Sequence, residues 1–497
     1  MSDTHLLDDS ASTSAVFADL GGPRRHERAV PFLIDDADDA AVSAYHHLRR
    51  HHFVDHQGLF DTTDLDGVDR HPDTIVLVAR RVDDDEILGG VRVHPVGDRG
   101  DGWWIGGRLV AASDAPRGVG EALVRAACSR VEAEGAFRFD ARVQVDKEAF
   151  FARLGWTSSG PVTLHGVEHV LMQWPIAIFE RVADHKSAIG RLVAPLAPGG
   201  STWVGDDGAP VPGTDVVAVN DAILPAMVER DPWWAGWCAV LVNVNDLTAM
   251  GAEPVGLLDT LAAPTESLAR RVISGMSAAA AAWDVPFLGG HTQTGVHAAL
   301  SVTMLGRTDD PVPGGGARPG KRLSLVADLG GSWRPGYTGR QWDSTSTRSP
   351  DHLRRMQSVV RDLRPDAAKD VSMAGLVGTT AMMAEASGVA ISIDVERIPR
   401  PAGVRLDHWL TCFPGFAMLV AHDDPITADD PRIDGLPVTV AEIGRIDSID
   451  DERAGGVTLH WPDGLEQRVL GGDVTGLGPV GRGDHPHSTT TGDDTHV

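Results

Sequence analysis

The chain has 497 residues, 42% of them hydrophobic, with 44 Lys and Arg against 70 Asp and Glu and a net charge of −26. This length predicts roughly three domains and several hydrophobic cores. The acidic balance argues against broad nucleic-acid binding, which requires a basic face. We therefore expect any phosphate site to depend on backbone N–H groups, magnesium and a few arginines.

Cysteine usage and hydropathy exclude further classes. Cys128, Cys238 and Cys412 lie far apart without a Cys-x-x-Cys pair, so neither a disulfide framework nor a zinc site is supported. No apolar run reaches the roughly 18 residues of a membrane span. The first residues lack the basic and apolar regions of a signal peptide. The sequence predicts a cytoplasmic protein with no membrane partner.

The predicted elements divide the chain into two unlike halves between polar ends. Residues 1–28 and 472–497 are expected to be disordered tails because they are polar and rich in small residues. Residues 29–178 alternate short strand and helix patterns. In chain order we expect strands at Ile75–Ala79, Ile87–His94 and Trp103–Ala111, a helix at Gly120–Glu134, a strand at Phe139–Val145, a helix at Glu148–Leu154 and a strand at Val167–Trp174.

A glycine-rich turn joins a strand to a helix in the first half. The strand ends at Arg108-Leu109-Val110-Ala111, and Arg117-Gly118-Val119-Gly120-Glu121-Ala122 opens an amphipathic helix. Glycines at a helix N-terminus let backbone N–H groups approach a pyrophosphate, whose charge the helix dipole favours. The turn indicates a phosphate-bearing ligand, and the alternative is an ordinary glycine-rich loop beside a basic residue.

Three further segments give this half a resemblance to the GNAT family of N-acetyltransferases. Tyr45-x-x-Leu48-Arg49 resembles the first helix of the family, and Val93 to Val110 holds the matching strand pair. Phe150-Phe151-Ala-Arg-Leu154-Gly155-Trp156 resembles the segment that closes the pantetheine side. The resemblance implies a domain over 29–178 in which acetyl-CoA or another acyl-CoA is bound by Arg117, Gly118, Val119, Gly120 and Ala122.

The same resemblance implies a base that takes a proton from an attacking amine and an acid that protonates the leaving thiolate. Many members use a tyrosine as the acid, but this chain has Phe150-Phe151 at that place. His165 and His169 are the candidate bases, and Glu121 is a weaker one. A CoA-binding domain without turnover stays open.

Acidic and amide side chains interrupt the apolar segments at the start of the second half. Carboxylates and amides in a buried run cost free energy unless they are paired or hold a cation. We therefore expect a divalent cation with bound phosphates, and the alternative is a buried helix with a polar end. The side chains concerned are Asn243, Asn245 and Asp246.

Residues 239–259 resemble the PurM-like, aminoimidazole ribonucleotide (AIR) synthase-related superfamily, whose Asn-x-Asn/Ser-Asp-hydrophobe-x-x-Met-Gly-Ala-x-Pro pattern carries magnesium–ATP ligands. The segment Pro286-Phe287-Leu288-Gly289-Gly290-His291-Thr292 is similar to its Gly-Gly-Asp/His-Thr motif, and Asp370-Val-Ser372-Met-Ala-Gly375 is similar to a helix start in its second domain. The resemblance implies Mg²⁺ on Asp206, Asp207, Asp221 and Asp246. It implies ATP on Asn245, Gly289, Gly290, His291 and Thr292.

The expected fold class is α/β and α+β, a GNAT-like mixed sheet with helices followed by a PurM-like two-subdomain α/β synthase fold. The resemblance implies an ATP- and Mg-binding subdomain over 185–312 and a C-terminal subdomain over 318–470. Apolar strands at Val216–Val219, Val255–Leu258 and Leu300–Leu305 favour a homodimer through the first of these. The alternative is that the first half covers those strands within one chain.

The glycine-rich loop 331–346 carries two Arg, two Trp and one Tyr. This composition is typical of a clamp for an anionic or planar substrate. The alternative is a surface loop with incidental aromatics.

The order of the two halves resembles a fusion of the GNAT-type and AIR synthase-related proteins encoded in bacterial nitrilase-containing gene clusters. It implies a bifunctional enzyme, an N-acyltransferase joined to an ATP-dependent synthase acting on a small nitrogen-containing substrate, with other enzymes of the same pathway as further partners. The alternatives are a small-molecule kinase of the thiamine-phosphate kinase type with a CoA-binding regulatory domain, and a non-catalytic scaffold that senses nucleotide and CoA.

Overall fold

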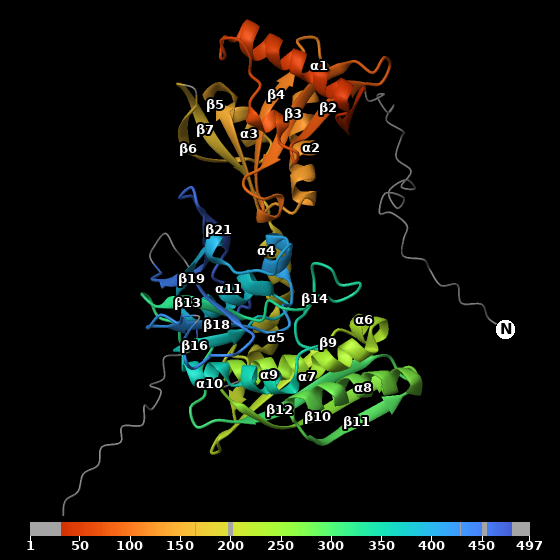
Figure 1. The fold of residues 1–497 in the computed structure, drawn as a ribbon, viewed down its shortest axis with the longest axis vertical. Helices are drawn as coiled ribbons and strands as arrows, with labels where there is room; N and C mark the ends of the chain where they lie inside the picture. Colours follow the sequence, from red (N-terminus) through yellow and green to blue (C-terminus); the bar gives the residue numbers. More distant parts are fainter. Residues whose placement is uncertain (1–30, 165, 197–201, 428, 450–454, 480–497) are drawn as a thin grey trace, which may run out of the picture. The chain divides into compact units, whose positions relative to one another are not determined.

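The computed structural model describes residues 31–164, 166–196, 202–427, 429–449 and 455–479. They form two compact units, which are described separately (Figure 1). Unit 1 contains the chain up to Val96, Trp104–Ala133 and Phe139–Trp174, and unit 2 contains Gly97–Trp103, Glu134–Arg138 and the chain from Pro175. The expected tail 1–28 and residues 480–497 of the second tail lie outside the described residues.

Unit 1 is built on a seven-stranded sheet in the order β1-β2-β3-β4-β5-β7-β6. Its strands are β1 (Phe32–Asp36), β2 (Ile75–Arg81), β3 (Ile87–Pro95), β4 (Trp103–Ala111), β5 (Arg138–Gln144), β6 (Thr157–Leu164) and β7 (Val167–Trp174). Its helices are α1 (Asp39–Arg49), α2 (Val119–Ala133) and α3 (Glu148–Arg153), and a π-helical turn follows α1 at Arg50–His56.

The elements expected in this half are confirmed, with small shifts at their ends. Helix α2 forms because Leu123, Ala127 and Val131 recur at helical spacing and are buried on one face. The sequence missed β1 and β6. Strand β6 lies at the edge of the sheet, where Pro161 is tolerated although it has no N–H group for a hydrogen bond to a neighbouring strand. All of its side chains are exposed or half-exposed.

The first part of unit 2 is a five-stranded sheet in the order β11-β10-β12-β9-β8. Its strands are β8 (Ala209–Pro210), β9 (Val216–Ile223), β10 (Glu253–Ala263), β11 (Phe287–Thr294) and β12 (Ala299–Arg307). The helices of this part are α6 (Pro225–Arg230), α7 (Pro232–Ala249) and α8 (Glu266–Trp283). Helices α4 (Ile178–Ala183) and α5 (Ile189–Val193) precede it along the chain, and α4 packs in the core of the second part of the unit.

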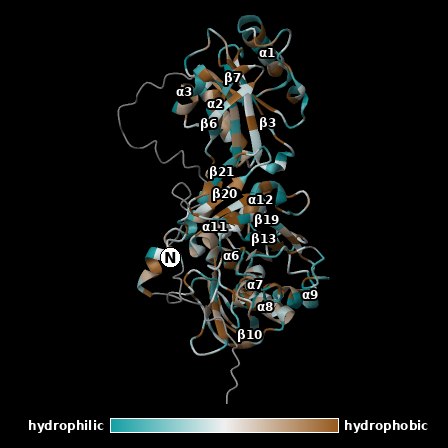
Figure 2. Ribbon diagram, turned by 90° about the vertical axis from the view of Figure 1, so that its left-hand side faces the viewer, coloured by the Kyte–Doolittle hydropathy of each residue, from teal (hydrophilic) through white to brown (hydrophobic). Residues whose placement is uncertain are grey.

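Helix α7 is the buried centre of this part, and nearly every one of its residues is inaccessible to solvent. It begins where Asp231 accepts a hydrogen bond from Trp234 N–H, with Pro232 in the first turn. It ends before Gly251, whose φ of 66° reverses the chain. The apolar character of α7 contrasts with the polar α9 (Pro350–Gln357), as can be followed in Figure 2. The interrupted run 239–259 is therefore a helix, a turn and a strand, as expected, although β10 continues to Ala263.

A second, seven-stranded sheet completes unit 2 in the order β16-β18-β13-β19-β17-β20-β21, beside the small pair β14–β15. The strands are β13 (Arg322–Ala327), β14 (Ser332–Trp333), β15 (Trp342–Asp343), β16 (Ala367–Asp370), β17 (Ala390–Asp394), β18 (Ala417–His422), β19 (Thr439–Asp447), β20 (Gly456–His460) and β21 (Glu466–Leu470). The helices are α9, α10 (Val359–Leu363), α11 (Gly375–Ser387) and α12 (Leu406–Thr411).

The second tail begins later than the sequence indicates. Val474 and Thr475 are buried although the tail was expected from residue 472. Their N–H groups donate to Glu385 Oε2 on α11 at 3.1 and 2.7 Å, and Gly478 N–H donates to Oε1 at 3.2 Å. A buried carboxylate that needs hydrogen bonds thus orders a polar segment that composition alone assigns to disorder.

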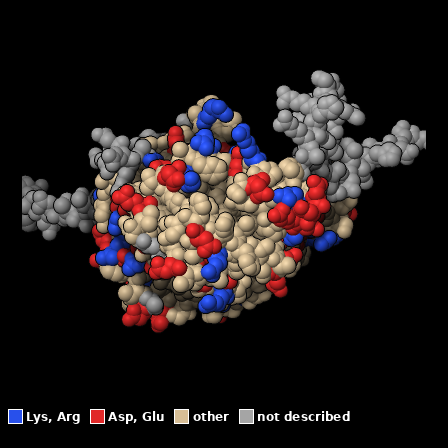
Figure 3. All heavy atoms as spheres, turned by 90° about the horizontal axis from the view of Figure 1, so that it is seen from above, with Lys and Arg blue, Asp and Glu red and all other residues tan. Residues whose placement is uncertain are grey.

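Surface chemistry agrees with the acidic composition. The face in Figure 3 carries basic and acidic side chains interspersed rather than a continuous basic face. Among the described residues, no helix is long and apolar enough to cross a membrane.

Candidate active sites

Buried carboxylates gather in unit 2 where the segment after Gly205, strand β9, helix α7 and strand β16 come together. Asp246 is 7% exposed on α7, and Asp370 is 5% exposed at the end of β16. Burial raises the pKa of both well above the usual range, and the mutual repulsion of these carboxylates adds to the effect. Ionising these carboxylates is therefore energetically unfavourable, and a bound cation would reduce that cost.

The two flanking aspartates feel the same environment. Burial raises the pKa of Asp206 to about 7 and that of Asp221 to about 6. One oxygen of Asp206 accepts the N–H of Gly314 at 3.0 Å, whereas its buried Oδ2 has no partner within the described chain. An unpartnered buried carboxylate oxygen is a position where a cation is favoured.

Asp207 differs from the other aspartates of the cluster because a lysine side chain of the protein already neutralises its charge. Lys369, 3% exposed, donates its Nζ proton to Asp207 Oδ1 at 2.6 Å and to the Gly205 carbonyl at 2.9 Å. Burial disfavours the charged lysine, but Asp207 and Asp206 more than offset this and raise the pKa of Lys369. The second oxygen of Asp207 accepts the N–H of Asp370 at 2.9 Å.

These residues fit a magnesium ion that arrives with its nucleotide. Among the described residues, no group of three His, Cys, Asp or Glu side chains is placed to hold a metal unaided. Mg²⁺ commonly takes only one or two carboxylates and completes its shell with phosphate oxygens and water. The free oxygen of Asp206 and the raised pKa values of Asp221 and Asp246 suit that arrangement. Asn245 is fully buried, and its Nδ2 donates to the Gly415 carbonyl at 2.8 Å while its Oδ1 is unpartnered.

The sequence missed Lys369 and did not assign Asp370 to the cluster. A signal was available, because the chain has only four lysines and Lys369 follows two alanines in a strand pattern. Another of the four, Lys186, lies close enough to influence the pKa of Asp221 and Asp370. Two of the four lysines of the chain therefore lie near this cluster of carboxylates.

The Gly-Gly-His-Thr segment lies apart from the carboxylates within one chain. Gly289, Gly290, His291 and Thr292 are exposed on the edge strand β11. Strand register places Asp221 opposite Val302, Val302 opposite Asp259, and Asp259 opposite Gly290. Three strand spacings separate Asp221 from Gly290, about 14 Å.

In the aromatic loop 331–346, Arg334, Tyr337 and Trp342 are directed inward, whereas Arg340 is exposed. Arg334 donates to Asp231 at 2.8 and 2.7 Å and lies over the Trp234 ring, 4.9 Å from its centre. Tyr337 and Trp342 are 8% and 5% exposed. These contacts fix the loop to the start of α7 and favour a structural role over a substrate clamp.

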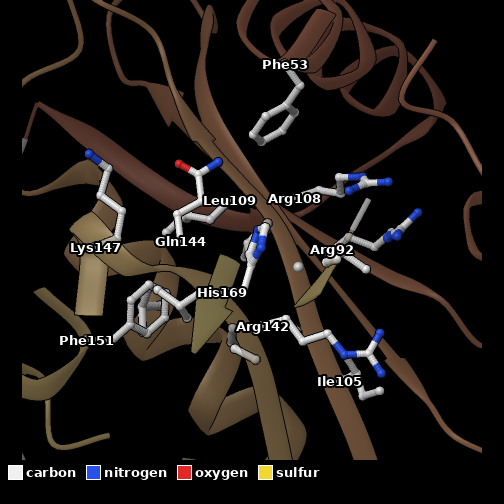
Figure 4. A pocket seen from close by; sticks show the side chains of 18 of the residues that line it. Phe53, Arg92, Ile105, Arg108, Leu109, Arg142, Gln144, Lys147, Phe151 and His169 are labelled. Atoms are coloured by element: carbon white, nitrogen blue, oxygen red, sulfur yellow. The ribbon is translucent and has the colours of Figure 1, made fainter. Parts of the chain in front are cut away.

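Unit 1 contains an open cavity of about 520 Å³ (Figure 4). Its wall comes from the π-helical turn, β3, β4, α2, β5, α3 and β7. At one side Phe150 and Phe151 form an apolar surface, and in Figure 4 His169 lies between Gln144 and Arg142. No tyrosine lines the cavity: Tyr337 belongs to unit 2, and Tyr45 is fully buried with its hydroxyl donating to the Arg108 carbonyl at 2.7 Å.

The glycine turn lies at the start of helix α2, which contributes Val124 and Ala127 to the cavity wall. Gly118 has a φ of 98°, and a Cβ at that position would meet no atom within 4 Å. A Cβ at Gly120 would meet only the Phe150 ring, at 3.9 Å. The first turn of a helix leaves N–H groups without partners, so the open space over this turn suits a pyrophosphate. Arg117 is exposed beside it.

The candidate bases have different surroundings. His169 is 7% exposed, and its Nδ1 lies 3.0 Å from the Val167 carbonyl, which favours a proton on Nδ1 and leaves Nε2 as an acceptor. Glu121 is exposed and pairs with Arg125 at 3.0 Å, outside the cavity wall. His165 lies outside the described residues.

Comparisons with known proteins agree with this division of the chain. Residues 39–156 match the acetyltransferase (GNAT) family, 205–308 match the AIR synthase related protein, N-terminal domain, and 322–453 match the C-terminal domain of that protein.

Three relatives illustrate the similarity. An uncharacterized Synechocystis protein, sll0787, is 35% identical over 46% of this chain and 72% of its own length. The Methanocaldococcus jannaschii protein MJ0640 is 31% identical over 37% of this chain, which spans 58% of that protein. A Caulobacter vibrioides thiamine-monophosphate kinase is 30% identical over 46% of this chain and 68% of its own length. The chain therefore belongs to the AIR synthase-related, PurM-like family, and its AIR synthase-related domains are preceded by a GNAT-family acetyltransferase domain.

Proposed function

We propose that the protein is bifunctional, transferring an acyl group from acyl-CoA to an amine in unit 1 and activating a small nitrogen-containing substrate with Mg–ATP in unit 2. The observation that carries the first activity is the cavity lined by His169 and by helix α2, whose start is the glycine turn. The match to the acetyltransferase (GNAT) family, the open space at the start of α2 and the apolar wall of the cavity also support acyl-CoA as the ligand.

In unit 1, bound acyl-CoA supplies an activated acyl carbon and a thiolate leaving group. The first-turn amides of α2 and the Arg117 side chain bind the pyrophosphate. Nε2 of His169 accepts the proton that the acceptor ammonium must lose before its nitrogen attacks. The amine nitrogen forms the new C–N bond, the C–S bond breaks, and the departing sulfur is protonated to give free CoA. A thiolate needs no strong acid, so Phe150-Phe151 is compatible with turnover.

In unit 2, bound Mg–ATP supplies the transferable phosphoryl group. One or two of Asp206, Asp221 and Asp246 would hold the cation, with phosphate oxygens and water completing its shell, and Asn245 lies next to Asp246 on α7. Positioning and charge neutralisation account for most of such catalysis. The Lys369–Asp207 pair fixes the segment after Gly205 against β16.

Two other functions remain as candidates for unit 2. The similarity to a thiamine-monophosphate kinase supports a small-molecule kinase, for which a phosphorylated product without a new C–N bond is expected. A nucleotide- and CoA-sensing scaffold would bind both ligands without consuming ATP. Product analysis by mass spectrometry distinguishes the three.

The acyl-CoA site is tested with Gly120→Trp in the full chain. An indole at this position fills the space over the helix start, so we expect acetyl-CoA binding measured by calorimetry to weaken by at least roughly tenfold, the effect of losing one or two charge-assisted hydrogen bonds. Gly471→Ala, at an exposed glycine with open space around it, is the control. No acetyl-CoA binding by the unmodified protein would refute the assignment.

A further inference from the structure

The charged groups around the unit 1 cavity are mostly matched in pairs. Arg49 donates to Asp64 and Asp69, each at 2.6 Å, and Arg92 donates to Asp66 at 2.7 Å. Arg92 also lies 2.7 Å from Asp69, and Arg108 contacts Asp66 at 3.2 Å. Three arginines therefore face three aspartates, and the network carries no net charge.

Arg142 is the unmatched cation of the cavity wall. It is exposed on β5, and no hydrogen bond or ion pair joins it to a carboxylate among the described residues. The other cation of this region, Lys147, is bonded to Asp146 at 2.7 Å. Asp140, two residues before Arg142 on the same face of β5, accepts a bond from Gln173 at 3.1 Å. Among the described residues, the wall thus presents a single uncompensated positive charge.

Strand register places this charge close to the candidate base. Gln144 on β5 is directly opposite His169 on β7. Arg142 is two residues from Gln144, so Arg142 and His169 share one face of the sheet as diagonal neighbours. Their Cβ atoms are therefore about 7 Å apart, and both side chains line the cavity (Figure 4).

We infer that the acyl acceptor is an amine bearing a carboxylate a few bonds from its nitrogen, an amino acid or a close analogue, and that Arg142 binds the carboxylate. This inference rests on the proposed acyl transfer in unit 1. Because His169 and Arg142 are diagonal neighbours that both line the cavity, one small molecule can present its amino group to His169 and its carboxylate to Arg142. The carboxylate of the acceptor supplies the negative charge that the wall lacks. The aromatic rings that line the cavity leave space for the acceptor's own side chain.

The role assigned to Arg142 is substrate binding rather than chemistry. Its guanidinium binds the acceptor carboxylate, which does not react. The interaction between the two groups is therefore equally strong in the ground state and the transition state. Losing it should raise KM and leave kcat nearly unchanged.

The test is a matched comparison of acceptors with the full chain and acetyl-CoA. Release of CoA thiol is measured with each of the twenty protein amino acids and with the primary amide of each. For the best amino acid we expect the amide to have a KM higher by roughly 10- to 100-fold, the range for a charge-assisted hydrogen bond. Arg142→Met should raise the KM of the acid by the same factor and leave the amide unaffected. The KM of the Arg142→Lys protein for the acid should lie between those of the unmodified protein and the Arg142→Met protein.

Arg153→Met, at an exposed arginine on α3 that does not line the cavity, should match the wild type. An amide that is acylated as well as the acid, or an Arg142→Met protein that keeps its preference, overturns the inference. If thiol release is absent with every amine, calorimetry with the same amino acids in the presence of CoA decides, and no binding of any amino acid overturns it as well. Loss of acetyl-CoA binding in Gly120→Trp tests the acyl-CoA site separately.

Discussion

Asp246 is the residue on which the proposed cation site of unit 2 depends most. It is buried inside an apolar helix with three other carboxylates close enough to disfavour its charge. We expect Asp246→Asn to reduce the magnesium-dependent affinity for ATP by roughly tenfold or more, because it removes one charged oxygen donor from a hard cation. Calorimetric titration with and without Mg²⁺ measures this, and Asp309→Asn, at an exposed aspartate, is the control. Equal magnesium-dependent affinities in Asp246→Asn and the unmodified protein would exclude Asp246 as a ligand.

At this scale, sequence reasoning found the acids but not their partners. Asp246 and Asp206 stand in recognisable local patterns, whereas Lys369 reaches Asp207 from more than 160 residues away. Arg142 was missed for a similar reason: its significance lies in the absence of a nearby carboxylate, which no local pattern records. Local motifs identify functional residues that are neighbours in the sequence. Contacts between residues far apart in the sequence can be identified only from the folded structure.

Helices α7 and α8 form the most tightly packed pair of elements in the first part of unit 2. A Cβ at Gly275 would lie 1.9 Å from the Trp233 carbonyl oxygen, and a Cβ at Gly236 would lie 2.1 Å from that of Val272. Since both obstacles are backbone atoms, no side-chain rotation relieves them. The crossing of the two helices therefore requires glycine on each side.

We expect Gly275→Ala to destabilise unit 2 by about 1–3 kcal/mol through overpacking. Alanine is favoured over glycine in a helix by about 1 kcal/mol, so a lower melting temperature identifies the close approach as the dominant effect. Differential scanning calorimetry is the measurement, with Gly471→Ala as the control. A melting temperature equal to or above that of the unmodified protein would contradict the packing argument.

Helix α2 was predictable from apolar spacing alone, and the helix–turn–strand expected at 239–259 was predictable from an apolar run that Gly251 and Pro254 interrupt. Strand β6 was not, because an exposed edge strand that contains Ser, Gly and Pro carries no alternating apolar signal. The order of strands in the three larger sheets was likewise beyond local sequence patterns, since it depends on pairings between distant segments.

The five-stranded sheet leaves apolar side chains uncovered in the single chain. Leu258 on β10 and Phe287 and Leu288 on β11 are 39%, 42% and 53% exposed. The prediction that apolar strands favour a dimer therefore has a specific surface, and we propose that a second copy of the chain covers it. The exposed Gly-Gly-His-Thr segment lies on the same edge strand.

Light scattering at micromolar concentration is expected to give about twice the chain mass of 52.8 kDa. Leu288→Asp should give the mass of one chain, because a charge at this position cannot be buried without a partner. Leu192→Asp, at a leucine 69% exposed on α5, should remain a dimer. A single-chain mass for the unmodified protein at these concentrations would exclude the dimer.

Glu385 has a consequence for the order in which the protein is completed during translation. Its carboxylate is buried on α11, and the groups that satisfy it, Val474 to Gly478, follow it by 89 to 93 residues. Until the ribosome has added them, α11 carries an unpaired charge in the position that later becomes its interior. The C-terminal sheet of unit 2 can therefore reach its final packing only after residues 474–478 have been synthesised, and a nascent chain stalled before residue 474 would expose this unfinished face to chaperones and proteases.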